Sequence, residues 1–346
     1  MSVKSAAKST LLMLPKIGPA LRERDRLFIE RNALVKQQED FVRDIVTLTN
    51  ERNEVATERD NLVSERRDVL AAYWAPPGHF YSPVADLSDV RRRREDIFNF
   101  ERRTYPGIDL HEDAQLQLLD ELEESYAEIP FSAEPKPNLR YHFDNPAFSY
   151  ADGILFYSLL RKLRPKRLIE IGSGYSSALA LDTNELFLDN SMETTFIEPF
   201  PELVRSLLRP DDQNRCRILD VPVQDVAMSV FEELGEGDIL FIDSTHVSKV
   251  GSDVNYLYFE VLPLLRPGVF VHIHDVFLGF EYPEDWIFQG RAWNEQYLLR
   301  AFLMENVRFD IVMMNSFMQH FHEQWFKDHM PLCLTDRGQS IWLQSK

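Results

Sequence analysis

The chain has 346 residues and a hydrophobic content of 44%, sufficient for one substantial α/β domain plus an additional element. Its formal net charge of −18 excludes the basic surface expected of a nucleic-acid-binding protein, so we expect no nucleic-acid partner. The two cysteines, Cys216 and Cys333, form no C-x-x-C pair, and no apolar run is long enough to span a membrane. These features favour a cytoplasmic protein without stable membrane insertion.

The first two segments are a leader and a long helix. Residues 1–20 contain an apolar run, Leu11–Leu14, that is too short for a signal-peptide core, and we expect a flexible leader. Residues 21–72 contain no proline or glycine and repeat an apolar residue at every seventh position. The repeated residues are Leu27, Leu34, Phe41, Leu48, Val55, Leu62 and Val69. A strict seven-residue repeat predicts a helix that supercoils with a partner, here a homo-oligomeric coiled coil.

The second position of the coiled-coil seam is mostly polar, as at Gln38, Arg52 and Arg59. We therefore expect the coil to be weak by itself. The alternative is a long solvated helix that packs on the rest of the protein.

Residues 73–147 form a helical lead-in region. Pro76 and Pro77 break the preceding helix, and a new helix is expected over residues 112–128. The run Arg91–Arg94 is typical of a solvated face. Residues 79–81 either cover an active site as a lid or pack under a loop.

Residues 148–346 alternate strand and helix patterns. Ser149 and Asp152 resemble a capping box that opens a helix ending at Leu163, and a second helix is expected over residues 294–305. The predicted strands are residues 167–171, 194–198, 217–220, 238–243, 269–275, 309–314 and 340–344. This order predicts a Rossmann-like, seven-stranded, mostly parallel sheet with an antiparallel C-terminal hairpin.

The first predicted strand ends in a glycine turn, Gly172-Ser173-Gly174, that leads directly into a helix. Both glycines permit a positive φ angle and a close approach of a ligand to the backbone. The first turn of the helix offers free N–H groups, and Glu170 at the strand end faces the same crevice. Parallel α/β sheets bind ligands at this edge, beyond the carboxyl ends of their strands.

The pattern Glu170-x-Gly172-x-Gly174 resembles the first motif of class I S-adenosylmethionine-dependent methyltransferases. A dinucleotide-binding fingerprint would instead need a third glycine where Ser177 stands. Glu198, at the end of the second strand, can accept hydrogen bonds from both hydroxyls of a ribose, which S-adenosylmethionine and NAD share. The resemblance further implies that Glu170 binds the methionyl ammonium and that Asp225 holds the adenine amino group.

Two groups of polar residues follow the fourth and fifth strands: Asp243-Ser-Thr-His246 and His272-Ile-His274-Asp275. Asp243, His274 and Asp275 offer the oxygen and imidazole donors that a divalent cation takes. Such a cation would bind a substrate hydroxyl and lower its pKa, and His246 would act as the general base. His272 is expected to point away from His274 and to be a buried core residue.

This constellation resembles metal-dependent O-methyltransferases of catechols and sugars. In that family an acidic ligand ends strand four, a lysine or histidine base lies three residues later, and two adjacent ligands end strand five. Asp243, His246, His274 and Asp275 fall on these positions. The family more often has a carboxylate where His274 stands, so a metal-free acid–base role for that histidine stays open.

The sequence thus predicts an S-adenosylmethionine-dependent O-methyltransferase with Mg²⁺ or Mn²⁺ as a second cofactor. The aromatic loop at residues 277–286 and the family resemblance favour a small polar acceptor such as a sugar or glycan, covered by this loop and by residues 293–296. Two alternatives are an NAD-dependent oxidoreductase and a coiled-coil assembly protein with a catalytically silent methyltransferase fold.

Overall fold

The computed structural model describes residues 15, 17–71 and 73–346, and it separates into two units with a boundary after Pro77. Most of the predicted leader lies outside the described residues. Within the part of the chain that is described, no helix is both long and apolar enough to cross a bilayer.

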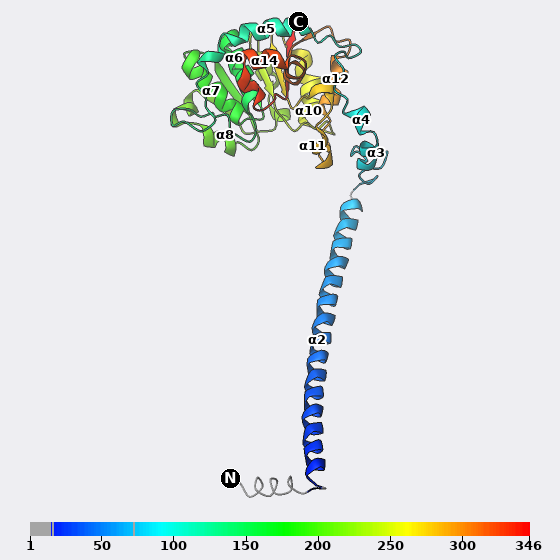
Figure 1. Ribbon diagram of the computed structural model, residues 1–346. Coiled ribbons are helices and arrows are strands. Elements are labelled where there is room, and N and C mark those ends of the chain that lie inside the picture. The colour runs from blue at the N-terminus through cyan, green and yellow to red at the C-terminus, as the bar shows by residue number, and fades with distance from the viewer. Residues whose placement is uncertain (1–14, 16, 72) are drawn as a thin grey trace. The chain divides into compact units, whose positions relative to one another are not determined.

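The first unit consists of one continuous helix, α2 (Gly18–Ala71), which confirms the predicted long helix (Figure 1). Its seven heptad residues are all exposed, by 55% at Leu27 to 65% at Val55. The helix therefore carries an exposed apolar stripe along its length.

The second unit is built on a seven-stranded sheet with the order β3-β2-β1-β4-β5-β7-β6. The strands are β1 (Arg167–Ile171), β2 (Glu193–Ile197), β3 (Cys216–Leu219), β4 (Ile239–Ile242), β5 (Phe270–His274), β6 (Phe309–Met314) and β7 (Ser340–Ser345). Strands β1 to β5 pair in parallel, and β7 runs antiparallel to both β5 and β6. The predicted fold class, including the C-terminal hairpin, is confirmed.

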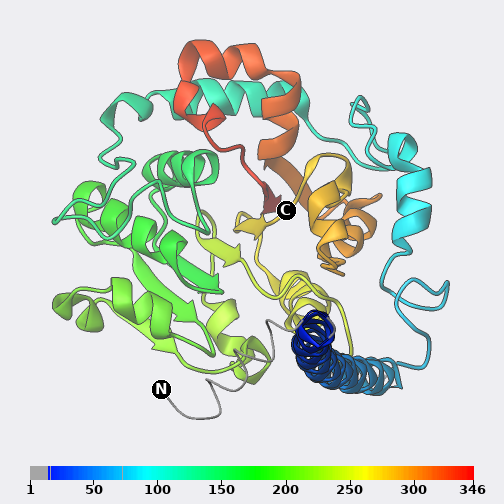
Figure 2. The ribbon, with the colours of Figure 1, turned by 60° about the horizontal axis from the view of Figure 1, so that its bottom comes forward.

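Helices cover both faces of the sheet, so its central strands are apolar throughout. Every residue of β4 is buried, as expected for a parallel strand that is covered on both sides. Helices α6 (Tyr150–Leu163), α7 (Tyr175–Phe187) and α8 (Glu202–Leu207) lie together on one side (Figure 2). Helices α10 (Asp253–Tyr256) and α12 (Glu295–Leu303) lie on the other side. Helix α10 continues through a π turn, Leu257–Val261, and a 3₁₀ turn, Leu262–Leu264.

The remaining helices are short and border this framework. They are α3 (Leu87–Arg92), α4 (Arg94–Ile97), α5 (Glu112–Glu123), α9 (Met228–Glu232), α11 (Glu284–Phe288), α13 (Asn315–Phe321) and α14 (Glu323–His329). The helix expected over residues 112–128 is thus α5 followed by a separate 3₁₀ turn, Tyr126–Glu128.

The capping box predicted at the start of α6 is wrong. The Ser149 hydroxyl donates to the Phe143 carbonyl (2.9 Å), and Asp152 does not serve the helix end. The Asp152 carboxylate instead accepts hydrogen bonds from Asn315 Nδ2 (2.7 Å) and Ser340 Oγ (2.5 Å). These buried polar groups of α13 and β7 need an acceptor, and no local pattern reveals that demand.

Candidate active site

The glycine turn after β1 depends on Gly172. This residue has a φ of +81°, and a Cβ atom there would lie 1.7 Å from the carbonyl oxygen of Asp243. Gly172 therefore lets the turn after β1 lie directly against the end of β4. Gly174 has an extended φ of −172°, so the positive φ expected there is wrong. The Ser177 hydroxyl accepts the Gly174 N–H (3.1 Å) and caps α7, which explains why serine suits this position.

A cavity of about 370 Å³ opens at the carboxyl ends of β1, β2 and β4. Gly172, Glu198 and Asp243 line it. The Glu198 carboxylate is held by two backbone N–H groups, those of Phe200 (2.8 Å) and Ser173 (3.2 Å). The predicted ribose acceptor is thus fixed in orientation while its remaining lone pairs stay available to a ligand.

Glu170 is fully buried under the first turn of α7. Its Oε1 accepts the Ser176 hydroxyl (2.5 Å), whereas its Oε2 and the Ser173 hydroxyl find no partner among the described residues. Burial raises the pKa of Glu170 to about 8. Neither residue lines the cavity itself, but Ile171 and Gly172, which lie between them in the chain, do. Unpaired buried polar atoms are groups that a polar ligand can satisfy.

Asp225 is not brought to this cavity. Its side chain is exposed, and the neighbouring Gln224 lines the cavity instead, with its amide donating to the Gly251 carbonyl (2.9 Å). The adenine-binding role of Asp225 stays a prediction without a contact that supports it.

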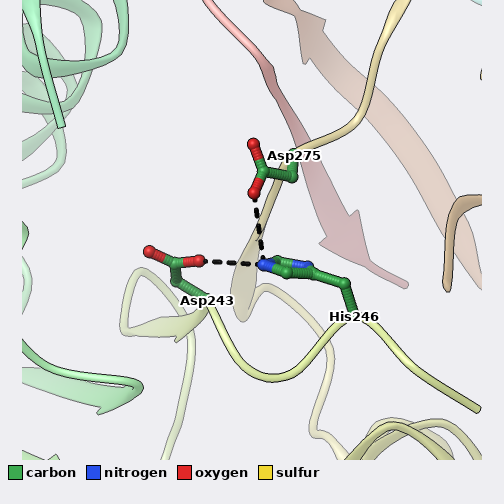
Figure 3. Close-up of side chains that lie close together, drawn as sticks. All are labelled: Asp243, His246 and Asp275. Carbon is green, nitrogen blue, oxygen red and sulfur yellow. Dashed lines mark ion pairs between the residues drawn. The ribbon is translucent and has the colours of Figure 1, made fainter. Parts of the chain in front are cut away.

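His246 is the centre of a buried cluster of carboxylates. Its Nε2 lies 3.3 Å from Asp243 Oδ1 and 3.3 Å from Asp275 Oδ2 (Figure 3). Its Nδ1 lies 2.8 Å from Oε2 of Glu295, the first residue of α12. Two of these partners lie at the ends of β4 and β5, so the sequence placed them correctly at one edge of the sheet.

The sequence did not predict Glu295 as a partner of His246. Glu295 lies 49 residues after His246 and is almost completely buried. The His246 carbonyl accepts the backbone N–H groups of Asn294 (3.0 Å) and Glu295 (3.1 Å), which ties the loop after β4 to the start of α12. An acidic first residue of a helix is common for electrostatic reasons, so the sequence carried no signal for this second role.

The backbone at this cluster is held in an unusual conformation. His246 has a φ of 59° and Asp275 a φ of 54°, both in the left-handed region that non-glycine residues seldom adopt. Such residues concentrate at functional sites, where the surrounding structure enforces the geometry.

The carboxylates of the cluster favour the protonated, imidazolium form of His246. Burial acts to lower the pKa of His246, but hydrogen bonds to Asp243 and Glu295 outweigh it and hold that pKa well above its usual value. Burial acts to raise the pKa of Asp243, yet the charges of His274 and His246 lower it. Burial raises the pKa of Asp275.

His274 and His272 share one face of β5, which corrects the expectation that they point apart. Residues two positions apart on a strand lie on the same side. His272 Nε2 lies 3.4 Å from His274 Nδ1, and the His272 ring stacks on Phe241 with centroids 3.8 Å apart. Burial lowers the pKa of His272 well below its usual value, in keeping with the predicted core role.

A second cavity, of about 510 Å³, contains the cluster. Its walls include Asp243, His246 and Asp275 together with Trp286 and Trp293 of the predicted aromatic cover. The Trp293 ring lies against His246, with centroids 4.6 Å apart. Asp243, Ser244 and Thr245 line both cavities, so the two meet at the end of β4.

Comparison with known proteins identifies the domain that holds the first cavity. The family model described as a methyltransferase domain matches residues 169–276, from β1 through Asp275. Residues 169–276 therefore form a methyltransferase domain. An uncharacterized protein of Archaeoglobus fulgidus is 39% identical to this methyltransferase over 170 residues, which are 47% of this chain and 75% of the relative.

Solved structures of methyltransferases resemble the chain at low sequence identity. An S-adenosylhomocysteine-bound methyltransferase of Podospora anserina is 16% identical and has a TM-score of 0.38, covering 75% of this methyltransferase and 96% of its own chain. An O-methyltransferase of Bacillus cereus, also in complex with S-adenosylhomocysteine, is 14% identical with a TM-score of 0.38, covering 75% and 97%.

Proposed function

We propose that this methyltransferase transfers a methyl group from S-adenosylmethionine to a hydroxyl oxygen of a small polar acceptor, with a sugar or glycan unit as the favoured class. The observation that carries the proposal is the meeting of the two cavities at Asp243–Thr245. One cavity has the features of a nucleoside site, and the other presents His246 between carboxylates.

The residues around the first cavity fit the cofactor. Glu170 Oε2 and the Ser173 hydroxyl are buried without protein partners, as groups that await the polar methionyl end would be. Glu198 offers its oriented carboxylate to the ribose hydroxyls, and Gly172 keeps the floor of the cavity free of a side chain. When bound, S-adenosylmethionine supplies an electrophilic methyl group.

His246 is positioned to move the acceptor proton. Its Nε2 lines the second cavity and would accept the hydroxyl proton when the imidazole is neutral, a form that grows as the pH rises toward its raised pKa, while Glu295 holds the Nδ1–H and fixes the ring. Asp243 and Asp275 stabilise the imidazolium that results, since each lies 3.3 Å from Nε2. Trp293 packs against the same ring, which is almost completely buried.

A specific observation supports a divalent cation as a second cofactor. Ligand atoms of Asp243, His246 and Asp275 lie within 4.8 Å of one another, and this donor set suits Mg²⁺ or Mn²⁺. A cation there would lower the pKa of the acceptor hydroxyl. His274, the predicted third ligand, does not belong to this group, so we propose His246 in its place, with Glu295 orienting the imidazole. In this alternative the cation takes the Nε2 lone pair, so His246 is a ligand and not the proton acceptor.

A calorimetric titration with S-adenosylhomocysteine, with and without Mg²⁺ or EDTA, tests both parts. We expect one binding site per chain, and failure to bind would contradict the methyltransferase activity. If transfer persists in EDTA, the cation is removed from the proposal and His246 remains as a metal-free base. If EDTA abolishes transfer and His246→Ala lowers Mn²⁺ affinity, His246 is a ligand.

We further propose that α2 pairs with the same helix of a second chain. Glu51, Glu58 and Glu65 each precede an arginine that occupies the second position of the seam. These arginines can pair with glutamates of the facing helix while the apolar stripes cover each other. Light scattering on the full chain should give at least twice the mass of 40.5 kDa, and a monomer at micromolar concentration would contradict this.

A further inference from the structure

Arg291 packs against two tryptophans, Trp286 and Trp293, at the acceptor cavity. Its guanidinium carbon is 4.0 Å from the Trp286 ring centroid and 5.3 Å from that of Trp293. The Arg291 N–H donates to the Trp286 carbonyl (3.1 Å), and the two indole rings meet edge to face at 5.2 Å. We call these three residues the Trp–Arg–Trp stack. The cation–π contacts hold the guanidinium at the cavity wall.

Within residues 73–346, the protein uses little of the hydrogen-bonding capacity of the Arg291 guanidinium. Its one side-chain hydrogen bond within residues 73–346 runs from Nε to Gln289 Oε1 (3.2 Å), and no carboxylate in that range lies within ion-pair distance. Both terminal nitrogens therefore keep their N–H groups for a ligand. The second arginine on the cavity, Arg337, differs because Glu323 pairs with it at 2.6 Å.

The stack is close to the proposed site of reaction. Trp293 contacts both the His246 ring and Arg291, so at most about 10 Å separates the imidazole centroid from the guanidinium carbon. A single substituted ring spans that reach, with a hydroxyl at His246 and a second group at Arg291.

The surrounding charge shows which second group suits Arg291. The chain carries a net charge of −18, and Asp152, Asp243, Asp275 and Asp336 line the same cavity. An anionic molecule is repelled from such a cavity unless a dedicated cation receives it. A planar guanidinium held by stacking binds the paired oxygens of a carboxylate or phosphate in a bidentate manner.

We propose that the acceptor is a hydroxylated ring bearing a carboxylate or a phosphate, and that Arg291 recognises this anionic group while the tryptophans cover the ring. This inference rests on the proposed methyl transfer, and it defines the class of substrate for the same site. The favoured acceptors are therefore acidic or phosphorylated sugars and aromatic hydroxy acids, and the neutral members of each class should be poor ligands.

Tryptophan fluorescence of the full chain, saturated with S-adenosylhomocysteine, provides the test. The probes are matched pairs: glucuronate and glucose 6-phosphate against glucose, and 3,4-dihydroxybenzoate against catechol. We expect an anionic member to bind at least about tenfold more tightly than its neutral partner in the wild-type protein. The glucuronate and glucose 6-phosphate arms show whether a carboxylate or a phosphate is preferred.

Three variants separate recognition by Arg291 from general charge effects. Arg291→Gln should abolish the preference for anions, and Arg291→Lys should retain only part of it because lysine lacks the planar fork. Arg337→Gln removes a charge from the same cavity wall but should keep the preference, since Glu323 already neutralises that arginine.

The outcomes distinguish this inference from the proposed function. Equal binding of the members of every pair, no response to any anionic probe, or an unchanged preference in Arg291→Gln would overturn the inference while calorimetric binding of S-adenosylhomocysteine leaves the methyltransferase intact. Loss of that calorimetric signal in the wild-type protein would overturn the proposed function itself. Each variant must match the wild-type thermal midpoint, which checks its folding.

Discussion

The two units of this methyltransferase differ in how far their apolar residues are buried. Residues of β4 are completely buried between helices, whereas the heptad residues of α2 are each more than half exposed. A parallel sheet covered on both faces supplies its own core, while a single helix with an apolar stripe depends on another surface. We therefore expect substitutions at the site to change the folding or activity of each chain, and substitutions in the stripe to change only the assembly of chains.

The largest effect is expected from Gly172→Ala. The added methyl group would lie 1.7 Å from the Asp243 carbonyl oxygen, and the positive φ adds strain. We expect a loss of at least ~3 kcal/mol or failure of the second unit to fold, measured by thermal unfolding monitored in the near-ultraviolet.

Gly237→Ala is the matched control for that change. Gly237 has a similar φ of +83° but no atom within 4 Å of the added carbon, so only the backbone cost of about 1 kcal/mol is expected. Equal destabilisation by the two variants would show that the contact between the turn and β4 is unimportant.

His246→Ala should lower turnover by about 10²- to 10⁴-fold with S-adenosylhomocysteine affinity nearly unchanged. Glu295→Gln keeps the shape of the positioning group and should lower turnover by roughly 10- to 100-fold. Turnover is measured with the anionic acceptor that binds best.

An Asp243→Ala, His246→Ala variant that keeps the protein's biological role would instead support a catalytically silent methyltransferase fold with an assembly function.

Glu170 gives the cofactor site a predictable pH dependence. Burial raises its pKa to about 8, so the empty site is mostly protonated at neutral pH. The ionised form is the better partner for the ligand ammonium, and S-adenosylhomocysteine affinity should rise roughly tenfold between about pH 6.5 and 8. Glu170→Gln should bind weakly and show a nearly flat profile by calorimetry.

The same shift makes a stability prediction of opposite sign. The folded state binds the Glu170 carboxyl proton more tightly than the unfolded chain does. Its contribution to the free energy of unfolding is therefore complete below the unfolded pKa of 4.5 and is lost as the pH rises toward 8. The ligand-free wild-type protein should therefore lose more thermal stability over this range than Glu170→Gln. Parallel losses in the two proteins would remove Glu170 as the cause.

The smallest effect on chemistry is expected from Val55→Asp on α2. A charge in the apolar stripe should lower the mass measured by light scattering but leave S-adenosylhomocysteine affinity within about twofold. Thr57→Asp adds the same charge two positions along, outside the stripe, and should keep the oligomer. Dissociation by both variants would point to net charge rather than to the stripe.

Much of the fold could be predicted because its signals are local. The order of strands follows from apolar runs that alternate with helices, and β6 has the predicted bounds, Phe309–Met314. Gly172, Glu198, Asp243 and Asp275 come together because carboxyl ends of parallel strands share one edge of the sheet.

The errors have non-local causes or a mistaken periodicity. Glu295 reaches His246 from a helix far along the chain, and Asp152 serves β7 instead of its own helix. Gly174 looked equivalent to Gly172 in the motif, but only Gly172 has a positive φ. The expectation that His272 points away from His274 is wrong, because residues two positions apart on a strand share a side.

Methyl transfer by this protein depends most directly on a nucleoside cavity whose oriented carboxylate is Glu198. Calorimetric titration of the full chain with S-adenosylhomocysteine, compared with Glu198→Gln, tests this claim. We predict one binding site per chain and an affinity of Glu198→Gln for S-adenosylhomocysteine at least roughly tenfold weaker than that of the wild-type protein, because the ribose hydroxyls lose a charged acceptor. Absence of binding to the wild-type protein, or equal affinity in both proteins, would contradict it.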